Sequence, residues 1–139
     1  MVVFVTGASA GFGAAIAGRF AKDGIRVVAA ARRTERLKAL NEEFGNLILP
    51  VTLDVRDKAQ VESVVTGLPS EFADIDILVN NAGLSQNLEP AHRVPLEDWD
   101  VMVDTNIKGL LYCTRQILPG MVARGRGHVV NIGSVAAVA

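Results

Sequence analysis

Five short apolar runs alternate with longer amphipathic segments along this chain, and this alternation limits the possible folds more than any other feature. Each run is apolar at successive positions, as in strands that are buried on both faces of a parallel sheet. The segments between them have apolar residues at helical spacing. We expect strands at residues 2–6, 26–31, 47–53, 75–80 and 128–132, and helices near residues 12–23, 34–44, 58–68 and 96–124.

This order of elements predicts an α/β fold with an open, doubly wound parallel sheet and helices on both faces. Right-handed crossovers favour the strand order 3-2-1-4-5. In such sheets, ligands bind outside the carboxyl ends of the strands. We therefore expect functional residues directly after the five strand ends, which are Thr6, Ala31, Leu53, Asn80 and Ile132.

Composition favours one soluble domain that binds a small molecule. The 139 residues are 50% hydrophobic, which suits a single domain over residues 1–139. With 14 basic and 15 acidic residues and a net charge of -1, the chain has no long-range field for nucleic acid or a membrane. Its one cysteine cannot form an internal disulfide, and the apolar residues 2–5 are too few for a signal peptide or a spanning helix. We expect a cytoplasmic protein.

Three glycines, Gly7, Gly11 and Gly13, follow the first expected strand and open the first helix. Backbone N–H groups and the helix dipole would converge there on a space that fits an anion such as a pyrophosphate. The alternative is an ordinary turn between strand and helix. The surrounding strand, helix and later motifs favour dinucleotide binding, with the contacts at Gly7, Ser9, Ala10, Gly11, Phe12 and Gly13.

Two arginines, Arg32 and Arg33, stand at the end of the second strand, where an enzyme that uses NAD has an acidic residue for the ribose hydroxyls. Guanidinium groups can instead pair with the 2′-phosphate of NADP. The alternative is a solvated start of a helix, but basic residues there would oppose the helix dipole. The sequence therefore predicts NADP as the cofactor.

The glycine pattern reads T-G-x-x-x-G-x-G, and with N-N-A-G at residues 80–83 it resembles the short-chain dehydrogenase/reductase family. The resemblance covers the whole chain. Within the family, T-G-A-S-A-G-F-G, A-R-R-T-E-R-L, I-D-I-L-V-N-N-A-G-L and E-P-A-H-R are most similar to the NADP-dependent serine and 3-hydroxy acid dehydrogenases. The resemblance implies a Rossmann-like fold and reversible hydride transfer between the nicotinamide and a small hydroxy acid or another carbinol.

The resemblance also implies further coenzyme contacts. Asp54, beside Val55, matches the residue that contacts the adenine amino group, although an aspartate here could equally cap a local turn. In N-N-A-G, the small residues would let the backbone lie against the coenzyme while the Asn amides brace the central strands. These contacts would involve Asn81, Ala82 and Gly83.

Two catalytic residues are implied by the same resemblance. Asn106 matches the asparagine whose backbone carbonyl holds a water of a proton relay, and Ser134 matches the serine that hydrogen-bonds the substrate oxygen. The helical spacing also places Asn106 on an expected buried stripe, where an amide would need partners. The stripe consists of Trp99, Val103, Leu110 and Ile117.

The family's Y-x-x-x-K pair is not found in these 139 residues, because the only tyrosine is Tyr112 and Gln116 stands four residues later. We expect Tyr112 to be a core or interface aromatic, and the chain alone to be inactive. Neither His92 nor His128 has a triad or metal-ligand partner at a recognisable spacing, so no metal site is expected.

The resemblance implies two further strands beyond residue 132, which these 139 residues do not include. Self-association is then expected for either of two separate reasons. A bare strand edge at residues 128–132, or the family's dimer-forming helix at 96–124, would make the chain self-associate into a homo-oligomer. Two hypotheses remain open: part of an enzyme truncated after Ser134, or a non-catalytic fragment that binds a dinucleotide. The intact mass of the purified protein would distinguish them.

Overall fold

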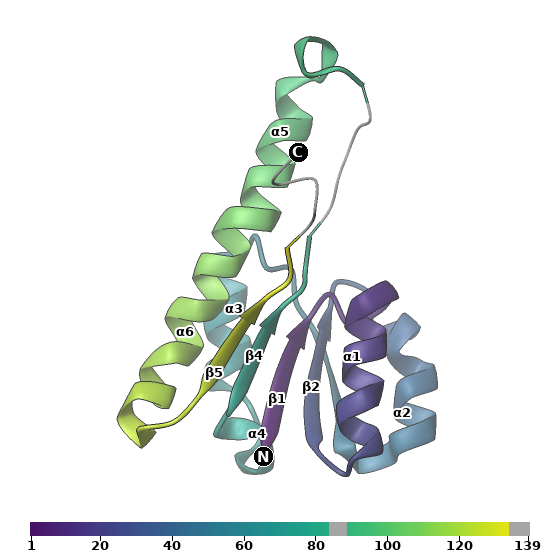
Figure 1. Ribbon diagram of the computed structural model, residues 1–139, viewed down its shortest axis with the longest axis vertical. Coiled ribbons are helices and arrows are strands. Elements are labelled where there is room, and N and C mark those ends of the chain that lie inside the picture. The colour runs from purple at the N-terminus through teal and green to yellow at the C-terminus, as the bar shows by residue number, and fades with distance from the viewer. Residues whose placement is uncertain (84–88, 134–139) are drawn as a thin grey trace.

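The computed structural model describes residues 1–83 and 89–133 and contains one parallel five-stranded sheet (Figure 1). Its strand order, β3-β2-β1-β4-β5, is the one expected from the sequence. The central strand β1 is buried at every position, and only its last residue, Thr6, is polar. The strands are β1 (Val2–Thr6), β2 (Arg26–Ala31), β3 (Ile48–Thr52), β4 (Ile77–Asn80) and β5 (His128–Asn131).

The connections between the strands are helical. Six α-helices are assigned among the described residues, with short 3-10 turns η1 (Thr34–Leu37), η2 (Gly45–Leu47) and η3 (Ala91–Arg93) and one π-helical turn, η4 (Asp104–Lys108). The α-helices are α1 (Gly11–Lys22), α2 (Lys38–Phe44), α3 (Lys58–Thr66), α4 (Ser70–Ala73), α5 (Leu96–Val103) and α6 (Gly109–Arg124).

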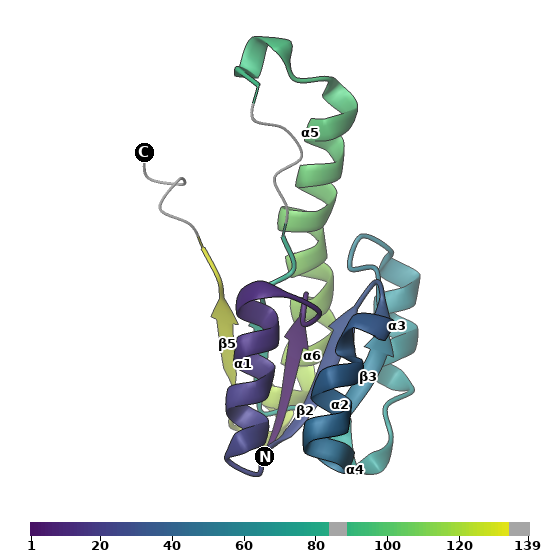
Figure 2. The same cartoon turned by 90° about the vertical axis from the view of Figure 1, so that its right-hand side faces the viewer.

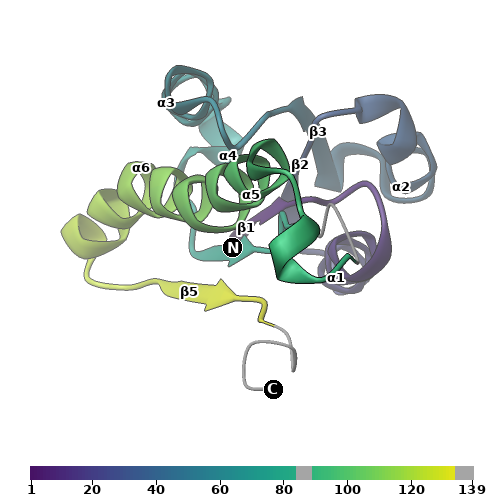
Figure 3. The ribbon, with the colours of Figure 1, turned by 90° about the horizontal axis from the view of Figure 1, so that it is seen from above.

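Helices cover both faces of the sheet, as the apolar runs predict (Figures 2 and 3). Successive residues of a strand point to opposite faces, and β1 shows this directly. Phe4 belongs to the core packed under α3, α4 and α6, whereas Val3 and Val5 belong to the core packed under α1 and α2. All of these positions are fully buried in the structure. The carboxyl ends of the strands are left free for a site.

The expected helix over residues 96–124 is wrong in one respect, because it is interrupted by the π-helical turn η4. A π turn adds one residue to the helical repeat and shifts the phase of the residues that follow. A helix over residues 34–44 is also divided, since its first turn is the 3-10 turn η1. The short helix α4 was not expected from the sequence.

The stripe expected to be buried is partly exposed, which corrects the sequence interpretation. Ile117 is buried, but Trp99 and Val103 are 41% and 43% exposed, and Asn106 is also exposed. Figure 1 shows the reason: α5 extends beyond the ends of the strands, where no sheet lies against it. Helical spacing identified an apolar face correctly but could not show which part of it the sheet covers.

Candidate functional site

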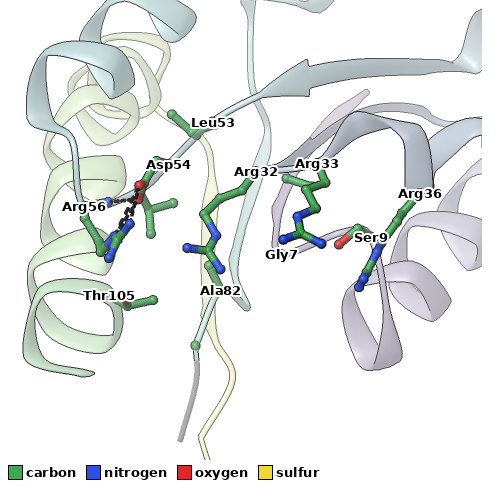
Figure 4. Close-up of a pocket in the computed structure, with 13 residues that line it drawn as sticks. Gly7, Ser9, Arg32, Arg33, Arg36, Leu53, Asp54, Arg56, Ala82 and Thr105 are labelled. Carbon is green, nitrogen blue, oxygen red and sulfur yellow. Dashed lines mark hydrogen bonds and ion pairs between the residues drawn. The ribbon is translucent and has the colours of Figure 1, made fainter. Parts of the chain in front are cut away.

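A pocket of about 370 Å³ lies at the carboxyl ends of the strands (Figure 4). Residues that follow β1, β2, β3 and β4 within two positions contribute to its wall, which is where a doubly wound sheet binds ligands. The lining residues are Gly7, Ser9, Ala31, Arg32, Arg33, Arg36, Leu53, Asp54, Val55, Arg56, Ala82, Gly83 and Thr105.

The glycine turn has a shape that larger residues would not allow. Gly7 and Gly11 have φ angles of +62° and +55°, in the left-handed region that favours glycine. A Cβ on Gly13 would lie 2.1 Å from the carbonyl oxygen of Gly7, so α1 starts in direct contact with the turn. A Cβ on Gly11 would meet no heavy atom within 4 Å, so the space beside this residue is open. The turn therefore presents backbone to an open space, as a phosphate site requires.

The start of α1 offers further support for an anion at this place. No side chain caps its N-terminus at Ala10, and its first turn contains no acidic residue. Its first N–H groups are therefore not satisfied by a cap, and its dipole is not compensated by a carboxylate. The two phosphates of a dinucleotide would supply both the hydrogen-bond acceptors and the negative charge.

The turn after β4 is fixed to the end of β1 by hydrogen bonds. The backbone N–H groups of Asn81 and Ala82 donate to Oγ1 of Thr6 over 3.0 and 2.9 Å. The side-chain amide of Asn81 donates to the carbonyl oxygens of Thr6 and Gly7, each over 3.2 Å. These bonds hold the two turns in a fixed relative position, so that Ala82 and Gly83 line the same pocket as Gly7.

Asn80 joins the end of β4 to its neighbours. Its amide nitrogen donates to Oδ1 of Asn131 in β5 over 3.0 Å and to Oγ1 of Thr114 in α6 over 3.1 Å. Asn80 is 6% exposed, and its Oδ1 has no hydrogen-bond partner among residues 1–83 and 89–133. The amide thus links β4, β5 and α6 directly before the segment that leads to Ser134, which lies outside the described residues.

Three arginines from the segment after β2 line the pocket: Arg32, Arg33 and Arg36 (Figure 4). None of them takes part in an ion pair within residues 1–83 and 89–133. Figure 4 shows Arg33 and Arg36 beside Ser9, whose hydroxyl is a further hydrogen-bonding group. This corner of the pocket therefore has the charge and the donors for a phosphate group.

The opposite wall carries an ion pair. Arg56 contacts both carboxylate oxygens of Asp54, with Nη2 2.7 Å from Oδ2 and Nε 3.0 Å from Oδ1. Hydrogen bonds from Arg56 hold the pKa of Asp54 below its usual value against an opposing effect of partial burial, and the charge of Arg32 acts in the same direction. The Asp54 carboxylate is therefore ionised at neutral pH. The backbone N–H of Arg56 also donates to Oδ1, so the local turn left open by the sequence is present.

The structure brings together eight of the thirteen expected coenzyme contacts in this pocket. Five others do not line it: Gly13 is buried behind the turn, Asn81 braces it, and Ala10, Gly11 and Phe12 are exposed at the start of α1. The eight lining residues are Gly7, Ser9, Arg32, Arg33, Asp54, Val55, Ala82 and Gly83.

Asn106 lies in the π-helical turn η4, with its side chain against the turn after β4. A Cβ added to Gly83 would be 3.2 Å from Oδ1 of Asn106, so the two residues are close neighbours. The preceding residue, Thr105, is buried and lines the pocket, and its Oγ1 has no hydrogen-bond partner in the described part of the chain. π-Helical turns are frequent at functional sites.

Sequence reasoning missed Arg36, Arg56 and Thr105 among the lining residues. Arg36 follows Arg32 and Arg33 by four and three residues, a spacing that places side chains on one side of a helical turn. Arg56 follows Asp54 by two residues, the spacing of an aspartate turn. Both signals were available. Thr105 had no comparable signal, because its position depends on the π turn.

Other chemistry receives no support from the described residues. No group of three or more potential metal ligands occurs within the part of the chain that the structure describes. Burial raises the pKa of the Cys113 thiol to about 12, so this cysteine is not a nucleophile at neutral pH. Tyr112 packs against the core and does not line the pocket. None of the described helices is both long and apolar enough to span a membrane.

Comparison with known proteins identifies the relatives of the chain. The family model described as short chain dehydrogenase matches residues 1–139. The NADP-dependent 3-hydroxy acid dehydrogenase of Salmonella typhi is 57% identical over 136 residues, which are 98% of this chain and 55% of that protein. The serine 3-dehydrogenase of Rhizobium radiobacter is 50% identical over 135 residues, 97% of this chain and 54% of that protein.

Solved structures similar to this chain include dehydrogenases of the same kind as the curated relatives. The closed form of a serine dehydrogenase complexed with NADP+ matches with a TM-score of 0.97 and 52% identity, over 100% of this chain and 56% of that one. A serine dehydrogenase from Escherichia coli matches with a TM-score of 0.96 and 52% identity, over 100% of this chain and 64% of that one. The resemblance seen in the sequence motifs is confirmed. The chain spans about half the length of the curated relatives it matches.

Proposed function

The chain belongs to the short-chain dehydrogenase family, and from this premise we propose that it is the coenzyme-binding part of an NADP-dependent oxidoreductase. Its reaction would be reversible hydride transfer between the nicotinamide and a small hydroxy acid or another carbinol. The names of the relatives, a 3-hydroxy acid dehydrogenase and a serine 3-dehydrogenase, support this substrate class.

The single observation that carries the proposal is the arrangement of the pocket at the ends of β1 and β2. A glycine turn that presents bare backbone stands beside three arginines that have no ion-pair partner among the described residues. A ligand with phosphate groups at two different points would bind to the glycine turn with one and to the arginines with the other. NADP carries a pyrophosphate and a 2′-phosphate, whereas NAD carries only the first.

Different segments of the chain would bind different parts of the coenzyme. The turn from Gly7 to Gly13 would hold the pyrophosphate, with contacts from Ser9, Ala10, Gly11 and Phe12 as well. The guanidinium groups of the segment after β2 would hold the 2′-phosphate, Asp54 and Val55 the adenine, and Asn81, Ala82 and Gly83 would border the path towards the nicotinamide. The cation from Arg36 adds to those of Arg32 and Arg33.

Catalysis requires the residues that the family uses around the nicotinamide. When bound, NADP supplies the hydride acceptor or, as NADPH, the donor. From this chain, Ser134 would hydrogen-bond the substrate oxygen, and the backbone carbonyl of Asn106 would hold a water of the proton relay. The position of Asn106 beside Gly83 supports its assignment, because Gly83 lines the coenzyme pocket.

A binding measurement on the purified chain tests the proposal. We expect isothermal titration calorimetry to show binding of NADP+, and saturating NADP+ at about 100 times its dissociation constant to stabilise the fold by about 2.7 kcal/mol. We expect no consumption of NADPH with a keto acid by the 139-residue chain alone, because Tyr112 packs against the core away from the pocket and the chain has no other tyrosine to act as the acid. Lack of NADP+ binding by a folded chain would refute the proposal.

We also propose that the protein is a homo-oligomer through the helical surface of α5 and α6. Leu111, Leu118 and Val122 recur at seven- and four-residue spacing on α6 and are 56%, 40% and 71% exposed. Apolar side chains in a continuous stripe favour a protein interface. Trp99 and Val103 on α5 are exposed too, on the part of the helix that extends beyond the sheet.

Introducing a charge into this stripe tests the interface. We expect Leu111→Glu to shift the protein towards the monomer in sedimentation velocity, because the carboxylate would be desolvated in an apolar contact. Ala123→Glu is a matched control, since Ala123 is an exposed residue of the same helix outside the stripe. If Leu111→Glu leaves the distribution of species unchanged, the exposed edge of β5 becomes the better candidate.

The proposed location is the cytoplasm. The only cysteine, Cys113, is buried, so the chain has no disulfide of its own that would need an oxidising compartment. NADP as a diffusible coenzyme is consistent with such a location. Fractionation of cells that produce the protein would test it.

A further inference from the structure

Asp54 and Arg56 are joined by several hydrogen bonds, in contrast to a surface ion pair with a single contact. Oδ1 of Asp54 accepts from the backbone N–H and from Nε of Arg56, both over 3.0 Å. Oδ2 accepts from Nη2 over 2.7 Å and from Nε over 3.2 Å. The side chains are only 30% and 33% exposed. Parallel hydrogen bonds from a guanidinium fix the orientation of the carboxylate and also stabilise its negative charge.

The rest of Asp54 is fixed too. Its backbone N–H donates to Oε1 of Gln60, and its carbonyl oxygen accepts from the N–H of Asp57 over 3.0 Å. Asp57 in turn caps the N-terminus of α3 through the N–H of Gln60 over 3.1 Å. The carboxylate of Asp54 therefore belongs to a turn in which backbone and side chain are both held.

One acceptor position remains on this carboxylate. An ionised carboxylate has about four lone-pair positions. Arg56 directs three hydrogens at them: the backbone N–H at Oδ1, one Nη2 hydrogen at Oδ2, and the single Nε hydrogen shared between Oδ1 at 3.0 Å and Oδ2 at 3.2 Å. Asp54 lines the pocket, and Figure 4 shows the guanidinium groups of Arg56 and Arg32 on either side of it. Oδ2 can thus accept one further hydrogen bond from a ligand in the pocket.

We propose that Arg56 is a positioning residue for base recognition: it holds Asp54 so that Oδ2 accepts a hydrogen bond from the exocyclic amino group of adenine, and the chain thereby selects adenine over a 6-oxopurine. This inference rests on the proposed function, because it concerns the base of the same coenzyme. The oxygen of a 6-oxopurine offers no donor at that position and would face an ionised carboxylate.

The chemistry of arginine explains why this residue type suits the role. Its planar fork contacts both oxygens of Asp54 at once, whereas a lysine ammonium is a single point charge on a flexible stem. Hydrogen bonds from Arg56 also lower the pKa of Asp54, that is, they favour the ionised form, which only accepts hydrogen bonds. A carboxylate that is free to rotate would lose rotamer freedom on accepting from the amino group, so the hydrogen bond would favour adenine less.

The experiment compares NADP+ with its hypoxanthine analogue, in which an oxygen replaces the adenine amino group. We expect the wild-type chain to bind NADP+ about tenfold more tightly by calorimetry, the size of one hydrogen bond to a charged group. In Arg56→Ala we expect the ratio to fall to about twofold or less, and in Arg56→Lys to an intermediate value. The ratio of NADP+ to NAD+ affinity should change little in both variants, because Arg32 and Arg33 remain.

Arg19→Ala is the matched control, since Arg19 forms a 2.8 Å ion pair with Asp23 that is exposed to solvent and does not line the pocket. It should keep the tenfold ratio. An unchanged ratio in Arg56→Ala, or a wild-type chain that binds both coenzymes equally, would overturn the inference alone. A folded wild-type chain that binds neither would overturn the proposed function. If Arg56→Ala does not fold, Arg56→Lys decides: a reduced ratio supports the inference and an unchanged ratio overturns it.

Discussion

Changing both Arg32 and Arg33 to alanine is expected to weaken NADP+ binding by about a hundredfold or more, while NAD+ binding changes only severalfold. Each guanidinium would lose a charge-assisted hydrogen bond to the 2′-phosphate, and such bonds contribute about 1.5–3 kcal/mol each. NAD+ has no phosphate at this position. Titration calorimetry with both coenzymes measures the two losses directly.

Arg26→Ala is the control for this double variant. Arg26 is an exposed arginine at the opposite end of the same strand, β2, and does not line the pocket. It should leave both affinities close to those of the wild type. Equal losses of NADP+ and NAD+ binding in the double variant would contradict the assignment of the 2′-phosphate. Adding Arg36→Ala should weaken NADP+ binding further.

The second large effect is expected for Gly13→Ala. The added Cβ would lie 2.1 Å from the carbonyl oxygen of Gly7 and 2.5 Å from Nδ2 of Asn81, so α1 would have to move away from the turn. Overpacking of this kind costs about 1–3 kcal/mol, which would lower the Tm of a chain of this size by roughly 10 °C. The displaced turn should also fail to bind NADP+. Thermal unfolding with and without NADP+ measures both effects.

Gly18→Ala is a matched control in the same helix. Its Cβ would be 3.5 Å from Cδ2 of Leu40, an ordinary contact, and alanine in a helix is more favourable than glycine by about 0.5–1 kcal/mol. This variant should keep or raise the Tm and bind NADP+ normally. A Gly13→Ala protein with the wild-type Tm and an undiminished response to NADP+ would show that the close approach is not needed.

The sequence predicted the sheet well because the signal for each strand is local. Both faces of β1 and β2 are buried, so their apolar runs end where the strands end, at Thr6 and Ala31. The strand order follows from the same runs through the rules of handedness. The edge strand β3 is shorter than expected, because residues 45–47 form a 3-10 turn instead.

The parts that could not be predicted depend on contacts between distant segments. The π turn that contains Asn106 lies near Gly83 in the turn after β4, and no local pattern in the sequence indicated it. The exposure of Trp99 depends on how far α5 extends beyond the sheet. At the site, residues next to strand ends were predictable, and the two-residue spacing of Asp54 and Arg56 indicated an aspartate turn, whereas the position of Thr105 depends on the π turn. Ser134 remains a prediction from the resemblance.

The hydrogen bonds from Asn81 to Thr6 and Gly7 have a consequence for the order of folding. They join residues 74 and 75 positions apart in the chain, so the glycine turn is held by a segment that is synthesised much later. Contacts of such long range form late, since a long loop must close first. The segment from β1 to α1 contains all residues of the glycine motif, but the hydrogen bonds that hold the conformation of the turn come from Asn81. We therefore expect the proposed phosphate site to form only when β4 has paired with β1.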